Sequence, residues 1–372
     1  MNPIDCLQKV TNFEWLSLDN EAGRHTYLKE WEKSGCRRPH DHPGFISFMQ
    51  PDGYSAVVAI YHHDETNRII YPFYWCELTE SPYFKNISLS LKHIVSPYGY
   101  GGALFEGDPM NRISVSQDFE ILFSKELRQR GFVTEFIRED IFTDRLSKRS
   151  VGQVIEQQPN VVVRLERNPD EIWRTYKSKV RKNVNRAKEH GLRVVFDPLG
   201  NNLDDFIKVY YETMERTEAS GTFFISLEKF QILVETLGKD GGLLFVHIYD
   251  GLEIVSTELL LLSGDSVYSF LGGTVATAFD KRPNDLLKHE VILWGGLNGY
   301  KWYVLGGGIT PGDGMFKYKE AFDPESIFPF QVRRVIHNHE AYKLLIQTRI
   351  NYEKDSGNDW QPKPDFFPEF LS

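Results

Sequence analysis

The chain has 372 residues, enough for two domains, and its 41% hydrophobic and 26% charged content is ordinary for a folded globular protein. The net charge of −9 disfavours a general nucleic-acid binder, although it is compatible with a local basic groove. The apolar runs are too short to span a bilayer, and the first ten residues contain no apolar signal core. We therefore expect a cytoplasmic protein that is not transmembrane.

The first half of the chain shows a β pattern followed by a helix. The predicted elements are strands at 45–49, 54–61, 69–75 and 132–138 and a helix at 116–130. The sequence Pro51-Asp52-Gly53 predicts a tight turn between the first two strands. Gly131 is a typical residue to end the helix, so the last strand follows it directly.

The second half repeats the same kinds of element. The predictions are strands at 161–165, 243–249, 252–262, 266–271 and 300–305, and helices at 173–190, 202–216, 283–297 and 339–352, with a shorter helix from Ser226. An Asp250-Gly251 turn joins two of the strands, as Asp52-Gly53 does in the first half. The shared order predicts an α/β (α+β) chain with two copies of one domain, each a mixed sheet flanked by helices.

Cysteine and histidine residues indicate neither a disulfide framework nor a metal centre. Cys6, Cys36 and Cys76 are few and scattered, and no Cys-x-x-Cys pair occurs. His40 and His42 could chelate a metal in principle, but they lie in a proline-flanked stretch that we interpret as a loop. We expect no metal site.

Three stretches could carry chemistry. Gly306, Gly307 and Gly308 follow the strand at 300–305, where glycines let a ligand approach the backbone; a flexible turn is the alternative. Lys317, Tyr318 and Lys319 come next, and a lysine there could stabilise an oxyanion, although two surface lysines fit the spacing too. Tyr98 and Tyr100 flank a glycine in a third stretch, which would suit a ligand or a packed strand connection.

The helix predicted at 173–190 has a concentrated basic face. This face includes Lys179, Arg181, Lys182 and Arg186 and would suit phosphate groups; an ordinary solvated helix face is the alternative. The chain contains no nucleophile elbow, zinc-protease helix or phosphate loop. Residues 128–133 are the nearest match to the pyrophosphate turn of acetyl-CoA enzymes, but they end a helix instead of starting one, which weakens an acyl-CoA reading.

As an ordered set, these stretches resemble the Fem-type branch of the GNAT acyltransferase superfamily, the peptidoglycan bridge-forming aminoacyl transferases. The matching sequences are SPYGYGG, WRTYKSKVRKNVNRAKEHGLRV, FIKVYYETMERTEA, RPNDLLKHEVILWGGLNGYKWYVLGGG and GMFKYKEAF, which together span roughly residues 96 to 322. The resemblance implies two GNAT-like domains, at 1–159 and 160–332, with residues 333–372 returning to the first. It also implies an acyl donor, aminoacyl-tRNA or acyl-CoA, as a co-substrate and no tightly bound cofactor.

The resemblance also implies roles for individual residues. Lys319 corresponds to a lysine near the donor ester, and Tyr318 stands where the family usually has phenylalanine. Arg216, Tyr98 and Tyr100 correspond to substrate-binding positions, and we also expect Gly306 and Gly307 to contact the substrate. We expect an N-acyltransferase that acts on an amino group of a cell-wall or polysaccharide precursor or another small amino compound. The alternatives are an acetyl-CoA-dependent N-acetyltransferase and a non-catalytic binding module with the same fold.

Overall fold

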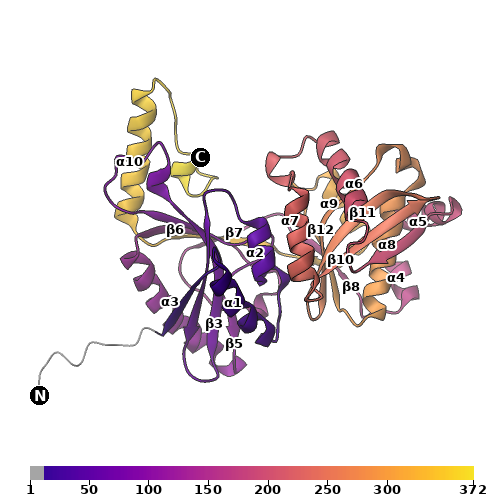
Figure 1. The fold of residues 1–372 in the computed structure, drawn as a ribbon, viewed down its shortest axis with the longest axis horizontal. Helices are drawn as coiled ribbons and strands as arrows, with labels where there is room; N and C mark the ends of the chain where they lie inside the picture. Colours follow the sequence, from indigo (N-terminus) through magenta and orange to yellow (C-terminus); the bar gives the residue numbers. More distant parts are fainter. Residues whose placement is uncertain (1–11) are drawn as a thin grey trace, which may run out of the picture. The chain divides into compact units, whose positions relative to one another are not determined.

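The computed structural model describes residues 12–372, which divide into two units (Figure 1). Cys6 and the N-terminal segment considered above lie outside the described residues. Unit 1 contains the chain up to Gly35 together with Met49–Ile155 and Gln331–Ser372, and unit 2 contains Cys36–Phe48 and Glu156–Phe330. The segment 36–48 thus joins unit 2, which the sequence did not indicate. No helix in the range 12–372 is both long and apolar enough to cross a membrane.

Unit 1 is built on a sheet with the strand order β1-β2-β3-β4-β6-β15-β7, and β5 pairs with β3 beside this path. The strands are β1 (Phe13–Ser17), β2 (Ser55–His62), β3 (Arg68–Glu77), β4 (Lys92–Val95), β5 (Leu104–Glu106), β6 (Phe132–Arg138), β7 (Gln153–Glu156) and β15 (Gln331–Ile336). The helices include α1 (Glu21–Lys33), α3 (Arg112–Gln129) and α10 (His339–Asp355). β4 and β6 run parallel, joined by α3, which packs Phe119 and Phe123 onto the sheet.

Unit 2 is built on a second sheet with the order β14-β8-β13-β12-β11-β10-β9. Its strands are β8 (Asn160–Arg164), β9 (Arg193–Asp197), β10 (Leu243–Asp250), β11 (Glu253–Leu262), β12 (Ser266–Thr274), β13 (Trp302–Gly306) and β14 (Ile327–Phe328). Its helices include α2 (Pro43–Met49), α4 (Pro169–Thr175), α5 (Ser178–Glu189), α6 (Leu203–Arg216), α7 (Leu227–Leu233), α8 (Pro283–Leu297) and α9 (Gly314–Glu320). β12 and β13 run parallel and are joined by α8.

The predicted pair of mixed sheets flanked by helices is confirmed, and the two sheets correspond strand by strand. β1-β2-β3-β4-β6 in unit 1 matches β9-β10-β11-β12-β13 in unit 2, with one parallel pair at the same place in each. The sixth strand comes from far along the sequence in both sheets: β15 lies next to β6, and β8 lies next to β13. In each sheet, the first five strands follow one another along the chain, and the strand that pairs with the fifth comes from a distant part of the sequence.

Two predicted elements were wrong. The strand expected at 45–49 is the helix α2, in which Phe45 and Phe48 lie on one face and contact Phe270 of unit 2. The helix expected at 173–190 is two helices, because the backbone is extended at Tyr176 and Lys177. There Tyr176 is buried in the core of unit 2, and the Lys177 amide donates to the Ala321 carbonyl at 2.9 Å. A periodic apolar stripe does not reveal such a break, since the stripe continues across it.

Candidate functional site

A cavity of about 520 Å³ lies in unit 2 and contains several of the residues singled out by the sequence. Its volume is in the usual range for small-molecule sites. The lining comes from α5, α6, β11, β12, α8 and α9. It comprises Lys179, Asn183, Thr213, Arg216, Thr257, Glu258, Ser269, Phe270, Leu271, Gly272, Gly273, Thr274, Phe279, Arg282, Pro283, Asn284, Asp285, Lys288, Met315, Tyr318 and Lys319.

The parting of β12 and β13 explains where the cavity forms. Residues 266–268 of β12 pair with 302–304 of β13, but β12 then continues to Thr274 while β13 ends at Gly306. Gly306 has a φ of 78°, which lets the chain turn away where most residues would be strained. The second half of β12 thus keeps one neighbouring strand, β11, and its other edge faces the cavity.

Lys319 is held at this opening by the turn that begins α9. Asp313 caps the helix by accepting a hydrogen bond from the Phe316 amide, and its second oxygen accepts from the amides of Ile309 and Thr310 in the preceding turn. The Lys319 ammonium donates to the carbonyl of Gly307 at 2.7 Å. Burial, together with the nearby positive charge of Lys288, lowers the pKa of Lys319 from 10.5 to about 8. The lysine is therefore mainly charged at neutral pH but gives up its proton more readily than a surface lysine.

A buried polar network forms one wall of the cavity. Lys288 donates to Glu258 Oε1 at 2.5 Å and to Ser269 Oγ at 2.9 Å. Tyr303 donates its hydroxyl to Glu258 at about 3 Å, and Ser269 donates to the same carboxylate. The carboxylate is thus already surrounded by donors, so it is better suited to holding Lys288 in place than to accepting a further proton.

Asp285 supplies a carboxylate with a free side at the start of α8. Its Oδ1 accepts a hydrogen bond from Asn183 at 3.1 Å, and no hydrogen bond to Oδ2 occurs within residues 12–372. Burial raises the pKa of Asp285 against the opposing effects of Asn183, Arg282 and Lys179. A carboxylate that takes up a proton more easily than usual is a candidate general base.

The remaining cavity residues add positive charge and an aromatic surface. Arg216 donates to the carbonyl of Thr274 at 3.2 Å and lies over the ring of Phe279, with 4.8 Å from the guanidinium carbon to the ring centroid. Lys179 lies exposed on α5. Tyr318 packs against Phe322, and its buried hydroxyl lies next to Asn284. Arg216, Lys179, Tyr318 and Lys319, four of the residues predicted from sequence, therefore meet in one cavity.

Other predicted residues lie elsewhere. Arg181 donates to the main-chain carbonyl of Tyr176, so it holds the break between α4 and α5. Lys182 and Arg186 are exposed on α5 and do not line the cavity. Tyr98 and Tyr100 belong to unit 1, and burial raises the pKa of both hydroxyls.

Sequence reasoning missed Glu258, Lys288 and Asp285. The available signal was a charged residue inside an apolar run: Glu258 interrupts the apolar strand β11, and Lys288 follows two leucines in α8. Buried charges in such places are paired or functional. Their mutual proximity depends on the sheet order, which the sequence pattern does not specify.

Comparisons with known proteins agree with this architecture. Residues 174–320, within unit 2, match the family described as "Acetyltransferase (GNAT) domain". No curated protein sequence is similar enough to the chain to give a match. The solved structure of FemX is similar in fold, with a TM-score of 0.64 and 13% identity, over 86% of this chain and 98% of that one. A conserved protein of unknown function from Bacteroides thetaiotaomicron VPI-5482 has a TM-score of 0.53 and 11% identity, over 87% and 99% of the two chains.

Proposed function

Because the chain has the tandem GNAT fold of the Fem type, we propose that it is an N-acyltransferase whose reaction takes place in the cavity of unit 2. The observation that carries the proposal is Lys319. A half-buried lysine with a lowered pKa, hydrogen-bonded to a glycine carbonyl beside a cavity, is unusual for a surface residue and common for a functional one.

In the proposed reaction, the acceptor amine attacks the carbonyl carbon of an activated acyl group. The new C–N bond forms, and the bond from the carbonyl carbon to the donor's oxygen or sulfur breaks. The Lys319 ammonium donates a hydrogen bond to the oxygen on which negative charge develops. It already donates to the Gly307 carbonyl, so its position is set before the substrate arrives.

Asp285 is the proposed acceptor of the proton that the attacking amine loses. One of its oxygens is fixed by Asn183, and the other is available to the cavity. Since burial raises its pKa, the carboxylate takes up a proton more readily than a solvated aspartate. The carboxylate would then pass this proton to the departing oxygen or sulfur of the donor, so that the leaving group departs as a neutral alcohol or thiol.

Positive charge around the cavity supports an anionic substrate. Lys288 is neutralised by Glu258, but Lys179, Arg216 and Arg282 have no carboxylate paired with them by a salt bridge within residues 12–372. Arginine binds phosphates and carboxylates well because its planar group donates two parallel hydrogen bonds. We propose that these residues hold the charged part of a substrate, with Lys182 and Arg186 extending the basic face of α5.

The first turn of α8 helps to decide which acyl donor the protein uses. A helix N-terminus can bind a pyrophosphate through its backbone amides, but the first turn here contains the Asp285 carboxylate and no glycine. A pyrophosphate bound there would face a negative charge. This favours an aminoacyl ester such as aminoacyl-tRNA as the donor, and an acyl-CoA is the second candidate.

The acceptor we propose is an amino group of a cell-wall or polysaccharide precursor or another small amino compound. This part rests on the sequence resemblance, in which Tyr98 and Tyr100 face the acceptor. A mass-spectrometric assay against a panel of amino sugars and peptidoglycan precursors, with aminoacyl-tRNA or acetyl-CoA as donor, tests it directly. The expected result is a new amide product with one donor.

Lys319→Ala is the decisive variant in that assay. Loss of one oxyanion donor lowers turnover by about 10²-fold or more. Lys317→Ala is the matched control, because Lys317 is exposed two residues away on α9 and does not line the cavity. Equal turnover in the two variants would remove Lys319 from the mechanism.

A non-catalytic binding module is the rival function, and it predicts binding without transfer. Thermal-shift titration separates the donors and the rival together, since a ligand that binds only the folded protein raises its melting temperature. Saturable stabilisation by acetyl-CoA would select the second donor. Stabilisation by a donor and an acceptor with no product would favour the binding module.

A further inference from the structure

A second cavity, of about 530 Å³, lies within unit 1, and the proposed reaction does not use it. Its charged lining is mainly basic: Arg128 lies in the last turn of α3, Arg334 lies on β15, His337 follows β15, and His339 begins α10. Tyr342 and Phe367 supply aromatic surface. We propose that this cavity binds a small phosphate-bearing ligand whose apolar part contacts the two aromatic rings.

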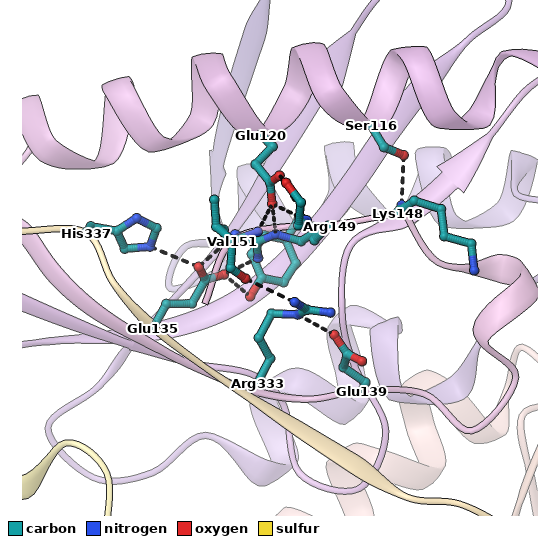
Figure 2. Close-up of polar contacts among 11 residues, drawn as sticks. Ser116, Glu120, Glu135, Glu139, Lys148, Arg149, Val151, Arg333 and His337 are labelled. Carbon is teal, nitrogen blue, oxygen red and sulfur yellow. Dashed lines mark hydrogen bonds and ion pairs between the residues drawn. The ribbon is translucent and has the colours of Figure 1, made fainter. Parts of the chain in front are cut away.

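His337, which lines this cavity, is hydrogen-bonded to a buried polar network (Figure 2). Its Nε2 lies 2.9 Å from Glu135, whose carboxylate also accepts hydrogen bonds from Arg149 at 2.7 and 3.0 Å. Burial acts to raise the pKa of Glu135, but Arg149 and His337 outweigh it and hold that pKa well below its ordinary value. Glu135 is therefore a permanent anion that orients the imidazole.

This orientation leaves one ring nitrogen of His337 for a ligand. Nε2 is committed to Glu135, and Nδ1 has no hydrogen-bond partner within residues 12–372. The side chain is only 2% exposed, and it lines the cavity. Nδ1 donates to a phosphate oxygen when both ring nitrogens carry a proton, and in the neutral ring it accepts a hydrogen bond from a ligand O–H.

Arg334 is also fixed in place, and Arg128 is available beside it. Arg334 donates to the carbonyls of Pro364 and Asp365 at 3.2 and 2.6 Å, lies over the ring of Phe367, and keeps a buried Nε without a partner among the described residues. Arg128 has no salt bridge within residues 12–372. A guanidinium that is already anchored loses little conformational freedom when it binds a phosphate.

The start of α10 adds to the positive potential. The helix has 17 residues, and His339 is its first. Asn338, the N-cap residue, accepts a hydrogen bond from the Ala341 amide at 3.0 Å. The backbone amides of the first two helix residues are therefore available to a ligand. One carboxylate, Glu369, also lines the cavity and opposes the two arginines. The two arginines and the helix N-terminus outweigh this carboxylate, so the cavity suits a doubly charged phosphate.

Phenyl phosphate is a suitable probe, because it combines a phosphate with one aromatic ring. Calorimetric titration of the full chain should show saturable binding, and Arg128→Gln should weaken it about 10-fold, as loss of a hydrogen bond to a charged group does. Lys125→Gln is the matched control: it removes one positive charge from the same helix, at an exposed residue outside the cavity. That variant should bind as the unchanged protein does.

Three outcomes would overturn the proposal. Equal affinity in the Arg128→Gln and Lys125→Gln variants would show that the cavity is not the site. Weaker binding in Arg216→Gln, with Arg128→Gln unaffected, would place the phosphate in the cavity of unit 2. Binding of benzoate as tight as that of phenyl phosphate would assign the cavity to a carboxylate. Neither Arg128 nor Lys125 belongs to the proposed catalytic site, so transfer activity should be unchanged in both variants, whether or not the proposed function is correct.

Discussion

The two units place a similar polar network at corresponding positions and use it differently. In each sheet, a tyrosine hydroxyl donates to a carboxylate between the third and the fifth strand. Unit 1 has Tyr71 on β3 and Glu135 on β6, with 2.6 Å between the oxygens. Unit 2 has the reverse arrangement, with Glu258 on β11 and Tyr303 on β13. A cation then completes each network: Arg149 in unit 1 and Lys288 in unit 2.

Whether the network lines a cavity depends on which part of the chain supplies its cation. Arg149 comes from a segment that is tied to α3, where Glu120 accepts the amides of Ser150 and Val151. Figure 2 shows this segment with Arg149 between Glu120 and Glu135. Lys288 instead comes from α8 itself, and both Glu258 and Lys288 line the cavity of unit 2. The same hydrogen-bonded pair thus stabilises one unit and shapes a site in the other.

The largest effect should come from removing Glu135, the carboxylate that is buried beneath the segment carrying Arg149. Glu135→Ala leaves Arg149 buried with only the longer contact to Glu120, at 3.6 Å, so the free energy of unfolding of unit 1 should fall by about 3–5 kcal/mol. Glu258→Ala should cost unit 2 less, because water in the cavity can hydrate Lys288. Native-state hydrogen exchange of the amides in β6 and β13 measures the two units separately.

Tyr71→Phe and Tyr303→Phe are the matched milder variants. Each removes one hydroxyl from the corresponding network and should cost about 1 kcal/mol. If Glu258→Ala cost as much as Glu135→Ala, the distinction between a sealed and an open network would be wrong. The pH dependence has a definite sign: the lowered pKa of Glu135 stabilises unit 1 at neutral pH, and this stabilisation is lost as the pH falls below the ordinary value of 4.5.

A smaller effect should follow from Asp285→Asn. The first turn of α8 contains this carboxylate, whereas the first turn of α3 in unit 1 has no acidic residue. If Asp285 accepts the proton of the acceptor amine, the substitution should lower turnover about 10²-fold with little change in substrate affinity. Asn183 can still hydrogen-bond the amide oxygen, so the fold should be kept. A KM effect without a kcat effect would make Asp285 a binding residue instead.

The sequence predicted the repeated architecture well because each repeat has local signals. The Asp-Gly turns, the glycines that follow some helices, such as Gly131 after α3, and the periodic helices are all readable without tertiary contacts. Gly251, for example, has a φ of 63° in the turn between β10 and β11. The errors occurred where tertiary contacts override local preference. Residues 45–49 are β-like in composition, but their aromatic residues are helical because they pack on unit 2.

The candidate site was predictable only in part. The lysine and tyrosine of α9 and the arginine of α6 could be selected by family resemblance, and the structure places them around one cavity. Glu258, Lys288 and Asp285 could not, because their importance comes from their burial and from the pairing of β11, β12 and β13. Lys319 could be named from sequence, but its lowered pKa depends first on its burial in the fold and then on Lys288, which is 31 positions away in the chain.

The smallest and most specific effect concerns pH, and it again contrasts the two units. Although burial opposes it, Glu135 raises the pKa of Arg149 in unit 1, so that cation never titrates near neutrality. Lys319 in unit 2, with a pKa of about 8, does titrate near neutrality. If its ammonium stabilises the oxyanion, turnover should fall as the pH rises through about 8. Lys319→Arg should move that fall to higher pH, since arginine stays charged.

The same titration should have the opposite effect on stability. Between pH 8 and the ordinary lysine value of 10.5, the unfolded chain binds more protons at this residue than the folded chain does. The contribution of Lys319 to the free energy of unfolding should therefore rise across this window while activity falls. Chemical denaturation of the unchanged protein and of Lys319→Met at pH 7.5 and 9.5, values chosen at about the two sides of the lysine titration, isolates that contribution. An activity loss that persists unchanged in Lys319→Arg would assign the titration to another group.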